Sequence, residues 1–187
     1  MESELMATNM SLQEMQKLAD VYLKESDQNS LPINISRLIN ENDFKILKLN
    51  LEMDGTSGLI MVDDDKPVFD FNINRLIVVD DSLSYERKRF ISAHEFAHFA
   101  LHKESGTMIR HRDVRNGNDD NLSPQEKEAD NFALCLLTPE SLVHAEVEKL
   151  KIDVPNPSPE FIVKYIAKKS EITDKKSRKR LEDLEII

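Results

Sequence analysis

The sequence has little of what secreted, membrane-spanning or disulfide-stabilised proteins need. It contains one cysteine, no tryptophan and four glycines in 187 residues. The single cysteine, Cys135, excludes a disulfide framework, and its place in an apolar run predicts a buried thiol. No apolar run approaches the ~20 residues of a membrane span, and the acidic N-terminus lacks the basic and then apolar layout of a signal peptide. We therefore expect a cytoplasmic protein without a membrane partner.

Positive charge is also in short supply. The chain holds 25 Lys and Arg residues against 35 Asp and Glu residues, which gives a formal net charge of −10 at pH 7. Nucleic-acid phosphates attract a positive surface, so direct binding to nucleic acid is not expected. An acidic protein attracts basic partners instead, and DNA-binding repressors are often such partners. The same acidity fits a protein whose charge only keeps it soluble, so charge alone does not choose a partner.

What the sequence does contain is the patterning of a globular protein. Its residues are 40% hydrophobic and 32% charged, which is enough for one well-buried core. Ser11 and Glu14 form a capping-box pattern before an apolar stripe, and Ile35 opens a second, shorter helical pattern. Strand-like runs, separated by turn-forming residues, follow at 44–51, 58–62, 68–72 and 76–79. These runs predict a small, mainly antiparallel sheet.

The most informative stretch is His94-Glu95-Phe96-Ala97-His98. The apolar residues around it repeat at helical spacing, so His94 and His98 lie one turn apart on one face and can direct ring nitrogens at one metal ion. Glu95 lies about 100° round the helix, where a carboxylate can act on water without binding the metal. This arrangement is typical of zinc peptidases. The alternative is an amphipathic core helix with one buried and one exposed histidine.

A third metal ligand is expected on a second helix. Glu126 and Asp130 are again four residues apart, so Glu126 can bind the metal while Asp130 accepts the outer N–H of a liganding histidine. Ser123 and Glu126 also match a capping box with Pro124 at the first helical position, in which the glutamate bends back onto the backbone. Glu128 is then the alternative ligand. Of the two glutamates we favour Glu126.

Two segments together resemble a known family. Residues 94–102 (HEFAHFALH) and 126–139 (EKEADNFALCLLTP) are similar to the paired motifs of the ImmA/IrrE metallopeptidases, and the resemblance covers roughly residues 30–140. Thr138 stands where methionine is usual in the family, at a packing position. The resemblance implies an α+β fold with a gluzincin-like minimal core, in which the small sheet packs against the zinc-binding helices and a helical C-terminal appendage follows.

The resemblance also implies a ligand and a substrate. In the family, the glutamate that matches Glu126 is the third zinc ligand. The implied substrate is a helix-turn-helix repressor or an antitoxin, cleaved to switch on a mobile element, a prophage or a stress response, although fold and zinc site alone do not fix a substrate. The alternative is a zinc-binding regulator that sequesters a DNA-binding partner without cutting it. Glu95 favours cleavage, because binding alone does not require a base.

The expected reaction is hydrolysis of a peptide bond by water. Zn2+ held by His94, His98 and Glu126 acidifies the water and polarises the scissile carbonyl, and Mn2+ can occupy the same ligands. Glu95 takes the proton from the water and delivers it to the leaving amine. A donor to the developing oxyanion is also needed. The candidates for this donor are His102, His111, Tyr85 and His144.

The remaining segments flank this centre. Residues 103–122, interrupted by Gly, Asn and Asp, predict a loop that borders the substrate cleft. Further on, two helical patterns carry eight basic residues between Lys164 and Arg180, which we interpret as a solvated helical face rather than a partner surface. The chain is therefore divided into a metallopeptidase domain with its N-terminal helix, 1–150, and a C-terminal helical appendage, 151–187. The sequence does not fix the oligomeric state.

Overall fold

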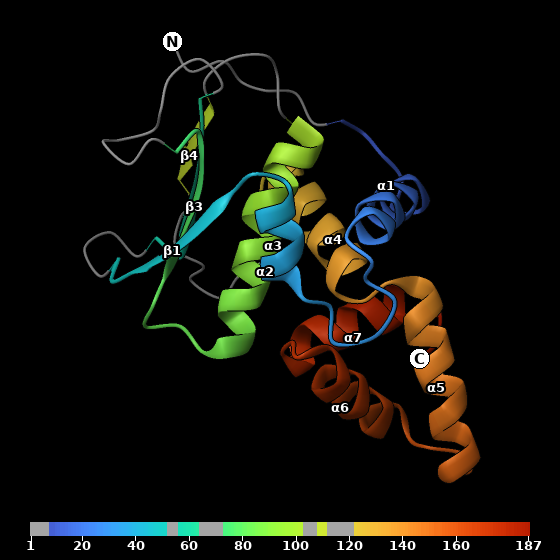
Figure 1. Cartoon of the computed structure of the whole chain (residues 1–187). Coiled ribbons are helices and arrows are strands. Elements are labelled where there is room, and N and C mark those ends of the chain that lie inside the picture. The colour runs from blue at the N-terminus through green and yellow to red at the C-terminus, as the bar shows by residue number, and fades with distance from the viewer. Residues whose placement is uncertain (1–7, 52–55, 64–72, 103–107, 112–121) are drawn as a thin grey trace.

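A computed structural model of the chain describes residues 8–51, 56–63, 73–102, 108–111 and 122–187. Its elements in chain order are α1 (Leu12–Glu25), α2 (Ile35–Glu41), β1 (Lys45–Leu49), β2 (Gly58–Val62), β3 (Arg75–Asp80), α3 (Tyr85–His102), β4 (Met108–His111), α4 (Pro124–Leu137), α5 (Glu140–Asp153), α6 (Pro159–Ser170) and α7 (Asp174–Asp183). The fold is α+β, as predicted. The sheet lies on one side of α3, with α4 and α1 on the other (Figure 1). None of the described helices has the length and apolar character that crossing a membrane requires.

The sheet has the strand order β1-β3-β2-β4. β2 runs antiparallel to both of its neighbours, whereas β1 runs parallel to β3. The predicted mainly antiparallel sheet is therefore confirmed, with one parallel pair. Both faces of the two central strands are covered, because one packs on α3 and the other carries a small cluster built on Met61, Leu76 and Val78. The strand expected over residues 68–72 lies outside the described residues.

One expected loop contains a strand. The sequence predicts a loop over residues 103–122, but Met108–His111 forms β4, which pairs with β2 from Leu59 opposite His111 to Val62 opposite Met108. The prediction is wrong at these residues because the strand is only four residues long and half of it is basic. Charged residues suit the edge of a sheet, but they hide the apolar alternation by which strands are identified. β4 lies at one edge of the described sheet.

Helix α3 lies at the centre of the molecule. It packs against β2 and β3 on one side, and against α4 and α2 on others. Aromatic rings join the layers: Tyr22 of α1 meets Phe96 of α3 edge-on at a centroid distance of 5.2 Å and Phe132 of α4 at 6.3 Å. In the same interior α3 also buries His94 and Glu95. Burying polar groups costs free energy unless they are paired, so their presence there calls for a functional explanation.

Caps fix where the helices begin. The capping box predicted at Ser11 and Glu14 is present, with the backbone N–H of each residue donating to the side chain of the other. At the start of α4, Pro124 occupies the first turn and Ser123 Oγ accepts the backbone N–H of Glu126 at 3.2 Å. Proline has no N–H to lose there, and its fixed φ suits a first turn. The start of α4 is thereby fixed, and with it the direction in which Glu126 leaves the helix.

The last three helices form a second hydrophobic cluster. Its buried members are Val143, Val147, Leu150, Ile162, Val163, Ile166 and Leu181. Two of the eight basic residues in this region, Lys176 and Arg180, are only 7% and 2% exposed. The interpretation of that stretch as a solvated face is therefore wrong for these two, because their charged ends find acceptors inside the protein. The division of the chain at residue 150 stays a prediction.

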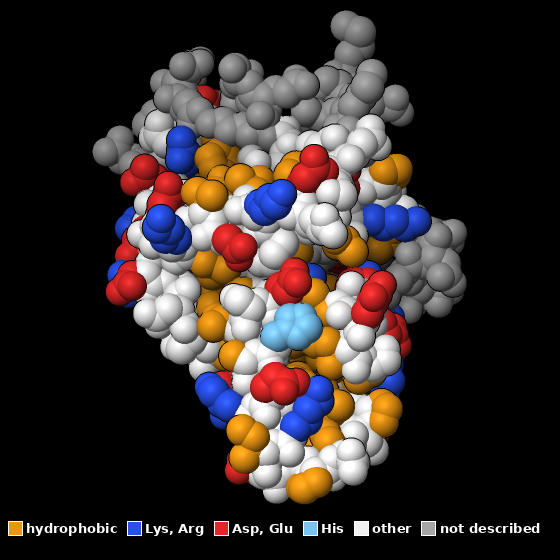
Figure 2. Space-filling view, turned by 90° about the vertical axis from the view of Figure 1, so that its right-hand side faces the viewer, with side chains coloured by type: hydrophobic (Ala, Val, Ile, Leu, Met, Phe, Trp, Pro, Cys, Tyr) orange, Lys and Arg blue, Asp and Glu red, His pale blue; other side chains and the backbone are white. Residues whose placement is uncertain are grey.

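Several of the other basic residues are paired with acidic neighbours. Lys169 meets Glu146 at 3.3 Å, Arg178 pairs with Glu160, and Lys179 pairs with Asp183 at 2.9 Å. On the face shown in Figure 2, acidic and basic side chains are interspersed rather than gathered by sign. This distribution is unlike the continuous basic stripe that nucleic-acid backbones attract.

Candidate metal centre

The two histidines of the HEFAH stretch face one another on α3. Because they are four residues apart, they lie one above the other on the same face of the helix. Their Nε2 atoms are 3.1 Å apart and the rings meet edge-on at a centroid distance of 4.8 Å. His94 is 0% and His98 2% exposed. The structure therefore brings these two ring nitrogens together in the interior.

Glu126 completes this group from the start of α4. Its two carboxylate oxygens lie 3.1 Å from His94 Nε2 and 3.1 Å from His98 Nε2. Ser123 caps α4 through the backbone N–H of Glu126, while the Glu126 side chain is directed at α3. Only the serine half of the expected capping box is therefore formed. The backbone N–H of Glu126 donates to Ser123 Oγ, while its side-chain carboxylate faces the two histidines.

These three side chains have the geometry of a metal site. Their candidate ligand atoms all lie within 4.8 Å of one another. Two ligands about 2.0–2.1 Å from one zinc ion, at a tetrahedral angle, are roughly 3.3–3.4 Å apart. The observed separations of 3.1 Å need to widen only slightly to admit an ion. Two imidazoles and one carboxylate are also the donor set of many catalytic zinc sites, so the residues present fit a divalent metal.

The electrostatics of the group favour a negatively charged carboxylate. Burial opposes ionisation of Glu126, but hydrogen bonds with His94 and His98 outweigh burial and hold the pKa of its carboxyl far below the usual value. A metal ligand must be deprotonated, and an ionised Glu126 meets that requirement.

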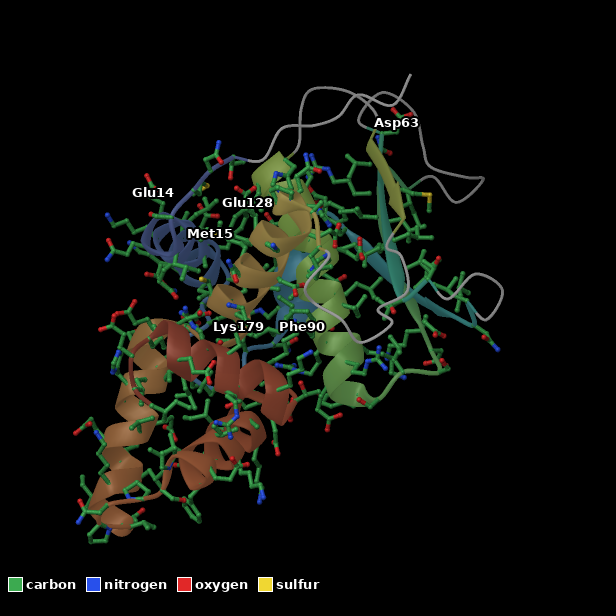
Figure 3. All side chains as sticks on the ribbon, turned by 180° about the vertical axis from the view of Figure 1, so that it is seen from behind. Glu14, Met15, Asp63, Phe90, Glu128 and Lys179 are labelled. Atoms are coloured by element: carbon green, nitrogen blue, oxygen red, sulfur yellow. The ribbon has the colours of Figure 1, made fainter. Side chains whose placement is uncertain are left out.

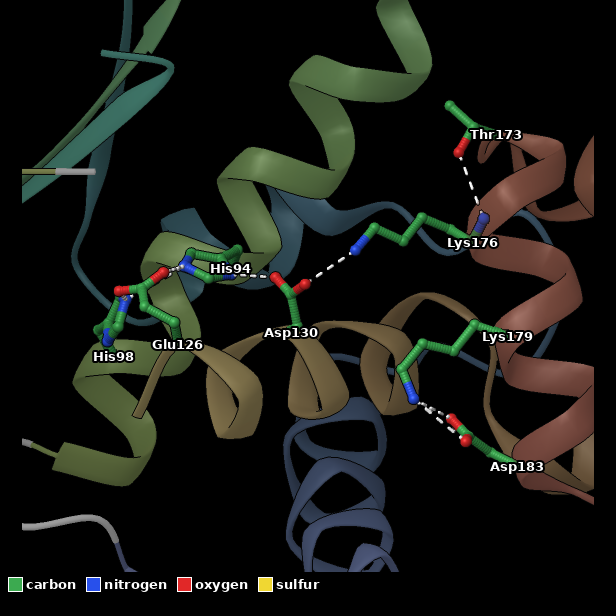
Figure 4. Close-up of polar contacts among 8 residues, drawn as sticks. All are labelled: His94, His98, Glu126, Asp130, Thr173, Lys176, Lys179 and Asp183. Atoms are coloured by element: carbon green, nitrogen blue, oxygen red, sulfur yellow. Dashed lines mark hydrogen bonds and ion pairs between the residues drawn. The ribbon is translucent and has the colours of Figure 1, made fainter. Parts of the chain in front are cut away.

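Asp130 lies behind His94, on the side away from the other donors. Its Oδ1 is 2.8 Å from His94 Nδ1, the contact that the sequence predicts (Figure 4). Its Oδ2 is 2.8 Å from Lys176 Nζ, which comes from α7. A carboxylate at Nδ1 favours the tautomer that carries its proton there, and this leaves the lone pair of Nε2 for a metal.

Glu128, the alternative ligand, points elsewhere. Its carboxylate accepts the backbone N–H groups of Thr8 and Asn9 at 3.0 and 2.7 Å, and it lies 3.6 Å from His102 Nε2. Figure 3 shows it on the side of α4 that faces the start of α1. Glu128 therefore fastens the segment before α1 and lies outside the group of converging donors.

Glu95 lies against the sheet. It is 1% exposed, and a β-carbon added at Gly58, the first residue of β2, would stand 3.1 Å from Glu95 Oε1 and 2.5 Å from Ile91 Cγ2. Only a residue without a side chain allows the strand to approach α3 this closely. The start of β2 thus passes directly beside the carboxylate expected to act as the base.

The four candidate oxyanion donors belong to three elements, α3, β4 and α5. His102 is buried beside Glu128, the Tyr85 hydroxyl donates to Glu171 Oε2 at 2.9 Å, and His144 is exposed on α5. His111 lies in β4 opposite Leu59, the neighbour of Gly58. The backbone of His111 is thereby placed at the part of the sheet that approaches Glu95.

Two residues near this centre were not predicted from the sequence. The sequence pattern predicts a strand at Gly58 without a role for the glycine, and a solvated position for Lys176. Lys176 carries no sequence signal for its role, because its inward position depends on a contact with Asp130, 46 residues away. Gly58 carries no such signal either, since its role depends on a contact with a distant helix.

Comparison with known families agrees with the geometry. The chain matches the model of peptidase family M78, described as the IrrE N-terminal-like domain, over residues 44–173. The match covers more than half of the chain and includes the sheet, both helices of the candidate metal centre and α6. No curated protein matches the chain. On the family match, and in agreement with the ImmA/IrrE resemblance of its motifs, the chain belongs to the IrrE N-terminal-like family of peptidases.

Proposed function

We propose that the protein is a zinc-dependent endopeptidase that cleaves a helix-turn-helix repressor or an antitoxin and so relieves repression. The observation that carries this proposal is the convergence of His94, His98 and Glu126, with Glu95 buried beside the sheet on the same helix. The family match supports hydrolysis of a peptide bond as the reaction class. We identify the metal as zinc from the donor set of two imidazoles and one carboxylate, and Mn2+ can bind to the same ligands.

Each residue of the site has a separate role in the proposed hydrolysis. His94, His98 and Glu126 would hold the metal, which when bound would supply Lewis acidity to acidify water and polarise the scissile carbonyl. Glu95 takes the proton from the attacking water and passes it to the leaving amine. Its burial excludes bulk water from the proton transfer, and Gly58 leaves the room that its carboxylate occupies. Asp130 keeps His94 in the tautomer that binds metal.

The edge of the sheet offers a place for the substrate. β4 pairs with β2 on one side, and it is the last strand of the described sheet on the other. An extended peptide can add to such an edge through main-chain hydrogen bonds, while side-chain pockets supply selectivity. A peptide lying along β4 runs past His111 towards the part of the sheet that adjoins Glu95.

The identity of the substrate rests on analogy and charge. The motifs resemble those of ImmA/IrrE peptidases, for which a DNA-binding repressor is the implied substrate. The net charge of −10 favours encounter with a basic protein. A helix-turn-helix protein encoded beside this chain is therefore the first substrate to try.

The decisive experiment replaces Glu95 by glutamine. Zinc-loaded wild type, Glu95→Gln and the control Glu86→Gln, on the first turn of the same helix, are each incubated with the neighbouring repressor and its operator. A general base contributes about a hundredfold to ten-thousandfold to rate, so Glu95→Gln should lose cleavage while zinc content and repressor binding persist. Glu86→Gln should cleave as wild type does.

The same experiment tests the alternative function. If wild type and Glu95→Gln both release the repressor from its operator and the repressor stays intact, proteolysis is not the activity and sequestration replaces it. If wild-type protein binds no metal after reconstitution with zinc, both functions fail.

A further inference from the structure

The C-terminal helices reach the metal centre through one buried side chain. Lys176 of α7 places Nζ 2.8 Å from Asp130 Oδ2, and the other oxygen of Asp130 lies 2.8 Å from His94 Nδ1 (Figure 4). Lys176 on α7, Asp130 on α4 and His94 on α3 are therefore linked by two successive polar contacts. Lys176 lies just beyond residue 173, where the family match ends.

Lys176 is held in this position from several sides. Its backbone N–H donates to the Thr173 hydroxyl at 3.4 Å, and its ammonium lies 4.1 Å from the centre of the Phe90 ring of α3. One turn further along α7, Arg180 Nε donates to the carbonyl of Thr138 at 3.1 Å. These contacts fix α7 against α3 and α4, so that the lysine side chain is directed inward.

Arg89 of α3 fastens the turn that precedes α7. Its guanidinium donates to the carbonyls of Ser170 and Glu171, each at 3.3 Å, and to that of Ile33 at 2.8 Å. The start of α7 is therefore anchored to the same helix that carries His94. The position of Lys176 relative to His94 is therefore fixed by Arg89, and a shift of α7 would change the contact between Lys176 and Asp130.

The buried lysine balances a buried carboxylate. The side chains of Lys176 and Asp130 are 9% and 6% exposed, and a carboxylate so far from water is costly unless an opposite charge compensates it. With the ammonium on Oδ2, Asp130 keeps Oδ1 directed at His94. The imidazole then donates from Nδ1 and turns Nε2 towards His98 and Glu126.

We propose that Lys176 is a positioning residue for the metal centre: it fixes Asp130, Asp130 fixes the ring and tautomer of His94, and α7 thereby sets the metal affinity. This inference rests on the proposed function in one respect, the role of His94 as a ligand. It goes beyond that function by making the C-terminal helix a part of the site.

The test compares two lysines of the same helix. Lys176→Met removes the buried ammonium and keeps an unbranched side chain, and Lys179→Met removes an ammonium that is 42% exposed and pairs with Asp183 of the same helix. Zinc affinity of the folded proteins is measured by competition with a chromophoric chelator. Loss of a group that hydrogen-bonds a metal ligand costs about tenfold to a hundredfold in affinity. Lys176 acts one contact further out, through Asp130, so the effect expected for Lys176→Met is the lower end of that range, about tenfold. Lys179→Met should change affinity by less than about twofold.

Asp130→Asn tests the route of the effect. If Lys176 acts through Asp130, the double variant Lys176→Met/Asp130→Asn binds zinc no more weakly than Asp130→Asn alone. The absorption spectrum of the Co2+-loaded protein adds a readout that a merely structural lysine would not move. Both Lys176→Met and Asp130→Asn should shift its ligand-field bands, and Lys179→Met should leave them in place.

The coupling between zinc binding and the position of α7 can also be tested by amide exchange, without an activity assay. If α7 raises metal affinity, zinc must stabilise the position of α7, so amide exchange over residues 174–183 slows on zinc binding in wild type and not in Lys176→Met. Lys176→Gln, which keeps a donor without the charge, replaces the methionine variant if that one does not fold.

The possible outcomes separate the two proposals. Equal or tighter zinc binding by the folded Lys176 variant, with wild type still binding zinc, overturns the role of Lys176 and leaves the proposed function standing. Absence of zinc from wild type overturns the proposed function itself.

Discussion

The half of the molecule around α3 and α4 and the half formed by α5, α6 and α7 use charge in different ways. The first half buries His94, Glu95, His98 and Asp130, together with further polar side chains such as His102 and Glu128, among many aromatic and aliphatic side chains. The second half packs aliphatic side chains together, and the charged side chains that it buries, Lys176 and Arg180, are directed at the first half.

This difference shows where free energy is used for function. Buried ionisable groups cost free energy, and clusters of them are concentrated at functional sites. The second half has no such cluster of its own among the described residues. It contributes instead the counter-charge that makes the cluster of the first half tolerable. The cluster of buried ionisable groups therefore lies in the first half, and its stability depends on the ion pair between Lys176 of the second half and Asp130.

The largest expected effect comes from removing a ligand in the first half. His98→Ala should lower zinc affinity by more than about a hundredfold, beyond the cost of losing a group behind a ligand, because one of three donors is gone. His144→Ala, an exposed histidine of the second half, is the matched control and should bind zinc as wild type does. Metal analysis after zinc reconstitution and desalting measures both. Equal and near-zero metal in wild type and His98→Ala would remove the site.

Two neighbouring glutamates of α4 should differ almost as much. Glu126→Gln should lose zinc, because an amide is a poor substitute for a charged ligand. Glu128→Gln should keep zinc but lower the free energy of unfolding by about 1.5–3 kcal/mol, since the carboxylate accepts two backbone N–H groups from the segment before α1. Zinc titration and urea unfolding of both variants give the comparison. The opposite pattern, with zinc lost only from Glu128→Gln, would move the third ligand by two residues.

The contact between sheet and α3 should give a smaller effect. Gly58→Ala introduces a methyl group 2.5 Å from Ile91 Cγ2 and 3.1 Å from Glu95 Oε1, which forces α3 and β2 apart. Overpacking of this kind costs about 1–3 kcal/mol in unfolding free energy. If the proposed function holds, zinc binding should persist while the cleavage rate falls, because the displaced residue is the proposed base and not a proposed ligand. A Gly58→Ala protein as stable and active as wild type would contradict the close packing described here.

Much of the fold was predictable because local chemistry determines it. The capping box at Ser11, the proline in the first turn of α4 and the apolar periodicity of the last helices each fix an element within a few residues. β4 was missed because its pairing with β2 depends on a distant strand, and four residues carry too little pattern. The parallel pairing of β1 with β3 was missed for the same reason.

The candidate site was predictable in part, for a related reason. Spacing of four residues placed His94 with His98, and Glu126 with Asp130, on single helix faces. That the two helices meet face to face, and that Glu126 rather than Glu128 faces the histidines, needed the packing of α3 on α4. Lys176 reaches Asp130 from 46 residues away, and no local pattern determines such a contact.

The smallest expected effect belongs to the ion pairs of Glu146 in the second half, whose lysine partners, Lys149 and Lys169, are 67% and 46% exposed. Glu146 accepts from Lys149 and Tyr165 and pairs with Lys169, and the Lys149 hydrogen bond is the main cause that lowers the pKa of its carboxyl. A carboxyl whose pKa is lower in the folded state stabilises the protein above its unfolded pKa, about 4.3, and loses that contribution as the pH falls through the folded pKa. Glu146→Gln should therefore reduce the free energy of unfolding by up to about 1 kcal/mol at pH 7, with the difference from wild type vanishing in acid. Urea unfolding at a series of pH values measures this difference. A difference that grows in acid would mean that the ion pairs of the second half contribute in a way unlike that of surface charges.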